Sequence, residues 1–163
     1  MARILILAGS EAMEAAMKLA RQFFLESTPA QPSRTKFIAR KESYHGTTLG
    51  SLSMSGHVAR RALFEPMLLD NVSRVSACNA YRGVQEGEKI QHYVARLAQE
   101  LDDEFVCVGP DTVCAFVAEP VVGAVSRFHS KTDHSLFLFN NLSLRRASRF
   151  PGLEQLSHNL HLL

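Results

Sequence analysis

The sequence predicts an α/β fold in which a mainly parallel sheet is flanked by helices. Short apolar runs, typical of buried strands, alternate along the chain with longer segments whose apolar residues recur every three or four positions. This alternation favours parallel strands that are joined by helical crossovers. The composition agrees, because 46% of the 163 residues are hydrophobic and 21% are charged, as in globular rather than disordered proteins.

The first expected elements are a short strand at 4–7 and a helix from 11 to about 24. Ser10 is placed to act as the N-cap of this helix. Glu14 and Lys18 are spaced as a favourable i, i+4 ion pair. The spacing assigns the apolar face of the helix to Ala12, Ala15, Ala16, Leu19 and Phe23.

The middle of the chain contains two further short strands and a segment of small residues. A proline-containing loop at 27–33 precedes a strand at 36–39, and a strand is expected within 71–77. Between these strands, 44–56 is rich in serine and glycine, which indicates close packing or a close approach of the backbone to another group.

A second helix and a longer strand follow. The helix is expected at 86–101, and the continuous apolar run at 112–118 reads as a central parallel strand that is buried on both faces. The apolar face of the helix is formed by Ile90, Tyr93, Val94, Leu97 and Leu101. From Val125 the alternation stops, so we expect part of an α/β domain at 1–125 and a divergent tail, irregular or disordered, at 126–163.

Several classes of function are disfavoured by composition. The net charge of +2 and the lack of a basic run interleaved with aromatics argue against nucleic acid as a partner. No apolar stretch approaches the roughly 20 residues that span a membrane. The three cysteines, Cys78, Cys107 and Cys114, are expected to be buried free thiols, which indicates a reducing compartment, cytoplasmic or mitochondrial. Neither their spacing nor that of the histidines in the tail favours a metal site.

The turn Gly9-Ser10-Glu11-Ala12 is the first segment that can carry chemistry. A glycine, a hydroxyl and the free N–H groups of a helix N-terminus can together hold a phosphate. Taken alone, such a turn is more often only a helix cap. It is neither a P-loop nor a dinucleotide-binding motif, because the further glycines and the lysine are missing.

Two further segments have the same ambiguity. In Tyr44-His45-Gly46-Thr47 the tyrosine ring can stack on a planar ligand, although a surface loop with a half-buried tyrosine is the simpler reading. Glu119 follows a buried strand, where α/β folds place ligands, but a glutamate at this position can equally form a cap or an ion pair.

The three segments together are more specific than any of them alone. The residues Gly9 to Arg21, the loop Tyr44-His45-Gly46-Thr47-Thr48-Leu49-Gly50 and the strand end Ala118-Glu119-Pro120-Val121-Val122-Gly123 resemble, in this order, the signature of class III pyridoxal-phosphate-dependent aminotransferases of fold type I. Cys78-Asn79-Ala80-Tyr81-Arg82-Gly83 also fits this family, and the resemblance covers residues 9 to about 124. It implies that 1–125 is part of the family's large pyridoxal-phosphate-binding domain.

The resemblance also implies roles for six residues. Gly9 and Ser10 would bind the cofactor phosphate, and Tyr44 would stack on the pyridine ring. His45 and Gly46 would shape the same loop, and Glu119 would lie under the cofactor. The implied reaction moves an amino group between an amino acid or amine and a 2-oxo acid through pyridoxal phosphate, in a homodimer.

Two residues of the family's chemistry have no match in context. The family pairs an aspartate with the pyridinium nitrogen and uses a Schiff-base lysine. Asp133 does not follow an apolar strand, and none of the lysines stands in the expected context, so no catalytic residue is assigned. We expect that the sequence from Val125-Ser126 is intron read-through, and that a segment before Gly9 is missing.

Two alternatives therefore stand beside the transaminase reading. The first is a catalytically inactive fragment that lacks the Schiff-base lysine and binds the cofactor weakly at most. The second is a different α/β protein that binds a nucleotide, for which the phosphate loop has too few glycines.

Overall fold

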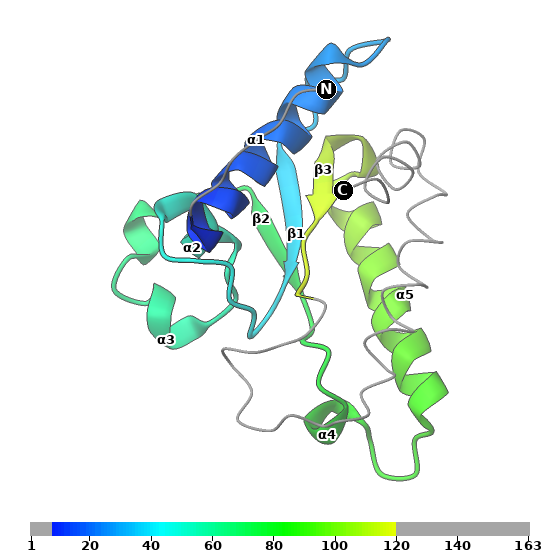
Figure 1. Ribbon diagram of the computed structural model, residues 1–163. Helices are drawn as coiled ribbons and strands as arrows, with labels where there is room; N and C mark the ends of the chain where they lie inside the picture. Colours follow the sequence, from blue (N-terminus) through cyan, green and yellow to red (C-terminus); the bar gives the residue numbers. More distant parts are fainter. Residues whose placement is uncertain (1–7, 120–163) are drawn as a thin grey trace.

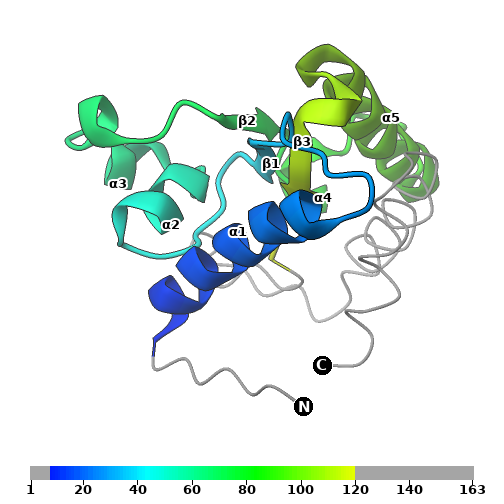
Figure 2. The ribbon, with the colours of Figure 1, turned by 90° about the horizontal axis from the view of Figure 1, so that it is seen from above.

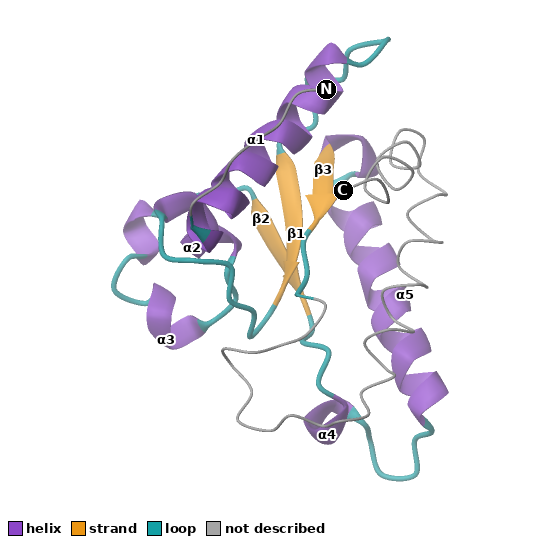
Figure 3. Cartoon of the chain, in the orientation of Figure 1, coloured by secondary structure: helices purple, strands orange, loops and turns teal. Residues whose placement is uncertain are grey.

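The computed structural model describes residues 8–119 (Figure 1). The expected strand at 4–7 and the tail at 126–163 lie outside the described residues. The predicted α/β class is confirmed, because three parallel strands form a sheet with the order β2-β1-β3, flanked by helices (Figure 3). The strands are β1 (Lys36–Arg40), β2 (Val72–Val75) and β3 (Val113–Phe116).

The strand β1 forms the centre of these three strands. Phe37 pairs with Val72 of β2 and Ile38 pairs with Phe116 of β3. We expected the 112–118 run to be the central strand, but β3 lies to one side of β1 among the described strands. In β3, Val113 and Cys114 are fully buried, whereas the second half of the strand is only partly buried.

The helix α1 (Gly9–Glu26) crosses one face of the sheet, and α5 (Ile90–Val108) lies on the other (Figure 2). Phe24 is fully buried, whereas Leu19, which the spacing places on the apolar face, is 47% exposed. The side chains that pack against the core are Met13, Met17, Ala20 and Phe23. The buried stripe is therefore rotated from the predicted one, because methionine and phenylalanine bury more apolar area than the alanines of the predicted face.

Two short helices that the sequence pattern does not predict lie within and just after the serine- and glycine-rich segment 44–56. These are α2 (Leu49–Met54) and α3 (Val58–Arg61), followed by the 3₁₀ turn η1 (Glu65–Met67). Arg61 donates to the carbonyls of Leu52, Ser53 and Ser55 at 2.9–3.0 Å, and Arg74 donates to those of Ser53 and Ser55. Two guanidinium groups thus satisfy carbonyls at the C-terminal end of α2.

After α4 (Ala80–Gly83), the helix α5 (Ile90–Val108) packs on the second face of the sheet and leads through η2 (Pro110–Thr112) to β3. The predicted helix at 86–101 is thus present but begins and ends later. Of the predicted apolar face, Ile90 is only partly buried but packs against the core. The other four residues are buried, and the complete buried set is Tyr93, Val94, Leu97, Ala98, Leu101 and Phe105.

All three cysteines are free, as expected, and Cys78 and Cys114 are buried. Cys107 contradicts the prediction of burial, because it lies on the exposed side of α5, near the C-terminal end of the helix. Among the helices within residues 8–119, none combines the length and the apolar character that crossing a membrane requires.

Candidate functional site

The candidate site lies where the three parallel strands end. The carboxyl ends of parallel strands meet at one edge of a sheet, the usual ligand position in α/β folds. β1 ends at Arg40 and leads into the loop that contains Tyr44, while Glu119 follows β3 by three residues. The backbone N–H of Tyr44 faces the carboxylate of Glu119 and acts to lower the pKa of that carboxyl. The structure therefore brings together two segments that are 75 residues apart in the chain.

The N-terminus of α1 contacts the same loop. The Ser10 hydroxyl accepts a hydrogen bond of 3.0 Å from the Thr47 N–H. Gly46 has a φ of +136°, and a Cβ there would lie 2.5 Å from the hydroxyl oxygens of Ser10 and Ser51 and 2.9 Å from the Ser10 Cα. Only glycine permits both this φ and this approach, so Gly46 is needed for the loop to contact α1.

The first turn of α1 is open to an anion. Ser10 is expected to be the N-cap, but Ala8 occupies that position, and no side-chain cap is present within the described part of the chain. Ser10 lies inside the helix instead, because its hydroxyl is used by the loop. The N–H groups of Gly9, Ser10 and Glu11 precede the first intrahelical bond, which Ala12 makes to the carbonyl of Ala8. A Cβ on Gly9 would meet no atom within 4 Å, so there is space beside these N–H groups.

His45 is buried in the loop with one ring nitrogen unused. Its backbone N–H donates to the Ser55 hydroxyl at 2.8 Å, and its side chain is 9% exposed. Within residues 8–119, its Nε2 has no hydrogen-bond partner. Burial lowers the pKa of His45 to about 4, so the imidazole is neutral at pH 7. A neutral ring can offer either a donor or an acceptor to a ligand.

The ring of Tyr44 already has one neighbour that the sequence does not reveal. The Cζ atom of Arg60, from α3, lies 4.7 Å from the ring centroid. This is a cation–π contact. It leaves only the opposite face of the ring for a planar ligand.

Glu119 is half-buried beside a buried arginine. Burial raises the pKa of its carboxyl, while the Tyr44 N–H and the charge of Arg40 act in the opposite direction. Its Oε2 atom is buried and has no hydrogen-bond partner among the described residues. Arg40 is 3% exposed, and burial lowers its pKa. Glu119 therefore presents an unused acceptor atom at the site.

Glu14 is a further functional residue that sequence reasoning missed. Its Oε1 atom accepts hydrogen bonds from the Thr48 hydroxyl at 2.6 Å, the Gly50 N–H at 2.9 Å and the Ser51 N–H at 3.2 Å. The spacing pairs Glu14 with Lys18, but this carboxylate oxygen binds the N-terminus of α2. The i, i+4 spacing from Ser10 was the available signal, because it places both side chains on one face of α1.

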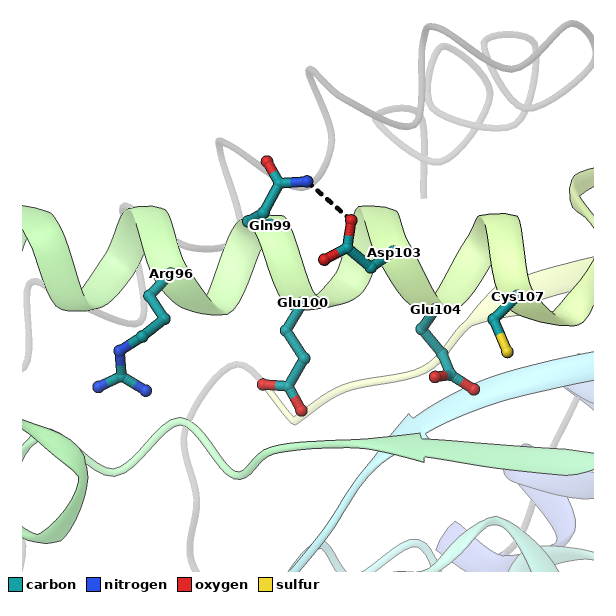
Figure 4. Close-up of a pocket in the computed structure, with 6 residues that line it drawn as sticks. All are labelled: Arg96, Gln99, Glu100, Asp103, Glu104 and Cys107. Atoms are coloured by element: carbon teal, nitrogen blue, oxygen red, sulfur yellow. Dashed lines mark hydrogen bonds between the residues drawn. The ribbon is translucent and has the colours of Figure 1, made fainter.

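A surface groove of about 560 Å³ lies elsewhere, along α5 (Figure 4). Glu100 and Glu104 point from the helix toward β2 and the residue after it, where Glu104 accepts a hydrogen bond from Ser73 and Glu100 accepts one from Ser76. The groove is lined by Arg96, Gln99, Glu100, Asp103, Glu104 and Cys107. None of the six predicted site residues lines it.

Comparison with known proteins identifies relatives of this arrangement. The profile of the family described as aminotransferase class-III matches residues 2–135. An aminotransferase of Gibberella zeae is 62% identical over 121 residues, which are 74% of this chain and 24% of that protein. An uncharacterized aminotransferase of Schizosaccharomyces pombe is 46% identical over 116 residues, 71% of this chain and 25% of that protein.

Among solved structures, the omega transaminase from Pseudomonas jessenii in complex with PMP is similar, with a TM-score of 0.73 and 29% identity. The match covers 86% of this chain and 30% of that one. The chain thus spans about a quarter of the length of the two curated relatives and under a third of that solved structure.

Proposed function

Because the chain belongs to the class III aminotransferase family, we propose that it supplies the phosphate-binding and ring-stacking part of a pyridoxal-phosphate site. The enzyme built around this site transfers an amino group between an amino acid or amine and a 2-oxo acid. The observation that supports the proposal most is the meeting of three segments at one sheet edge: Ser10 with Gly46, and Tyr44 with Glu119.

The residues at this edge fit such a cofactor. A phosphate needs several N–H donors, and the uncapped first turn of α1 offers those of Gly9, Ser10 and Glu11. The Ser10 hydroxyl accepts from Thr47 and can still donate its own hydrogen. The buried, unused Nε2 of His45 and Oε2 of Glu119 offer polar contacts to a ring.

Each residue then has a distinct task. Gly9 and Ser10 bind the phosphate, and Gly46 lets the loop reach α1. Tyr44 holds the ring on the face opposite to Arg60, which adds about 0.5–1.5 kcal/mol for stacked aromatic pairs. Glu119 orders the loop through the Tyr44 N–H. When bound, the cofactor supplies an electron sink for the substrate's α-carbon.

Cofactor binding can be tested without enzymatic turnover. Pyridoxamine phosphate lacks the aldehyde that would react with surface lysines, so it is titrated into the 163-residue chain. Pyridoxamine, which has no phosphate, is the comparison ligand. We expect pyridoxamine phosphate to bind more tightly than pyridoxamine. In Ser10→Ala, the ratio of the two affinities should fall about tenfold, which corresponds to the loss of about one hydrogen bond to a charged group. Ser27→Ala, at the other end of α1, should have no effect. Equal affinity for both probes would exclude the proposed site.

We further propose that the chain taken alone is catalytically inactive, as the fragment alternative holds. The sequence favours this, because no lysine in it stands in the context of the family's Schiff-base lysine. Among the described lysines, Lys36 begins β1 at the end opposite to Tyr44, and its amine donates to the Val108 carbonyl at 3.1 Å. With pyridoxal phosphate bound, addition of an amine should therefore cause no transamination, measured as formation of the 2-oxo product; product formation would contradict this.

The partners and the compartment are also proposals. The partners are a small amino donor and a 2-oxo acid acceptor, and the assembly is a homodimer, both by family resemblance. The free thiols, two of them buried, favour a reducing compartment, cytoplasmic or mitochondrial.

A further inference from the structure

Two helix N-termini lie side by side at the candidate site, and among the described residues they differ in what occupies them. In α1, the N-cap Ala8 offers no side-chain cap to the first N–H groups. In α2, by contrast, the N–H groups of Gly50 and Ser51 both donate to the carboxylate of Glu14. An anion can therefore compete for the first turn of α1 but meets a carboxylate already in place at α2.

Glu14 also fixes the loop relative to α1. Ser10 holds the loop at Thr47, and Glu14, one turn further along the helix, holds it at Thr48 and Gly50. The contact is close, because a Cβ on Gly50 would lie 2.4 Å from the Glu14 carboxylate. These bonds set the distance between the loop and the N–H groups of α1.

We propose that Glu14 is a positioning residue of the phosphate site. It occupies the N-terminus of α2 and holds the loop from Thr48 to Ser51 on α1, so that the phosphate binds at Gly9 and Ser10. Glu14 touches neither cofactor nor substrate in this role. The inference rests on the proposed function, since it concerns the site at which the phosphate would bind.

Removing Glu14 distinguishes this role from a purely electrostatic one by the sign of the effect. Ser10 and Glu14 lie on neighbouring turns, so removing a carboxylate there should strengthen phosphate binding if charge alone matters. If Glu14 positions the loop, its removal should weaken phosphate binding. A role in stability alone should lower affinity for pyridoxamine and pyridoxamine phosphate equally.

The test measures the ratio of the dissociation constants for pyridoxamine and pyridoxamine phosphate in the 163-residue chain. We expect Glu14→Ala to lower this ratio about tenfold and to leave pyridoxamine binding within about threefold. Glu14→Gln should keep most of the ratio, because its amide oxygen can still accept from Gly50 and Ser51. Glu26→Ala, at the far end of α1, is the matched control and should leave the ratio unchanged.

Thr48→Val provides a milder perturbation if Glu14→Ala does not fold. It removes one of the three donors to Glu14 with little change in shape, and it should lower the ratio about threefold. An unchanged or increased ratio in whichever of these two variants folds overturns the inference. A wild-type ratio near one would contradict the proposed function as well. If the wild-type ratio is large and only Ser10→Ala lowers it, the proposed function stands and the role of Glu14 is refuted.

Discussion

Gly46→Ala should be among the most destabilising small substitutions at the site. The φ of +136° is a conformation that alanine adopts at a cost of about 1–3 kcal/mol. The added Cβ would also lie 2.5 Å from two hydroxyl oxygens and 2.9 Å from the Ser10 Cα. The hydroxyls can rotate away but the backbone atom cannot, so overpacking adds about 1–3 kcal/mol. We expect the free energy of unfolding to fall by about 2–6 kcal/mol, the sum of these two costs.

Urea denaturation followed by far-UV circular dichroism measures this change, and two other glycines separate its causes. Gly87 has a φ of +76°, and a Cβ there would meet no atom within 4 Å, so Gly87→Ala should cost only the conformational part, about 1 kcal/mol. Gly9 has neither constraint, so Gly9→Ala should be neutral or stabilise by up to about 1 kcal/mol. If Gly46→Ala is no more destabilising than Gly87→Ala, the close contact between the loop and α1 is refuted.

Three further predictions concern pH and packing. Burial lowers the pKa of His45 from 6.5 to about 4, so the wild type should lose about 3 kcal/mol of stability as the pH falls through this range. The variant His45→Gln should not show this loss. Equal pH profiles of the two proteins in urea denaturation would refute the burial of His45. Burial raises the pKa of Glu119 above 4.5, so this carboxyl loses its proton at lower pH in the unfolded chain than in the folded one. Relative to Glu119→Gln, the wild type should therefore lose stability as the pH rises above 4.5. A gain in stability would contradict the burial of Glu119. On α5, Leu97 is 3% exposed, and Leu97→Ala should lower the free energy of unfolding, measured in urea, by about 2–5 kcal/mol. Val106 is 67% exposed, and Val106→Ala should change the same quantity by no more than about 0.5 kcal/mol. Similar effects of the two substitutions would mean that the buried face of α5 is wrongly assigned.

The sequence pattern was sufficient to predict α1 and α5, whose apolar residues recur every three or four positions, and the three strands, which are short apolar runs. It could not predict α2 and α3. The segment of α2 is rich in serine and glycine, and this helix is held at both ends by residues from elsewhere in the chain, Glu14 at its N-terminus and Arg61 and Arg74 at its C-terminus. Such long-range bonds leave no local pattern.

The candidate site, like the fold, could be predicted only in part from the sequence. The motif order predicted which segments form the site, and the structure places Ser10 with Gly46 and Tyr44 with Glu119. The neighbours Arg40 and Arg60 were not predicted, because one is brought in by the sheet and the other by α3. The cofactor roles of the six residues and the domain boundary at 125 stay predictions.

The central claim, a phosphate site at the first turn of α1, is tested most directly by mapping the backbone amides. Pyridoxamine phosphate is titrated into the isotope-labelled 163-residue chain while amide resonances are followed by NMR. We predict the largest shifts at Gly9, Ser10 and Thr47, and much smaller ones with pyridoxamine. Shifts confined to the groove along α5 around Arg96 and Cys107, or no shifts at all, would contradict the account.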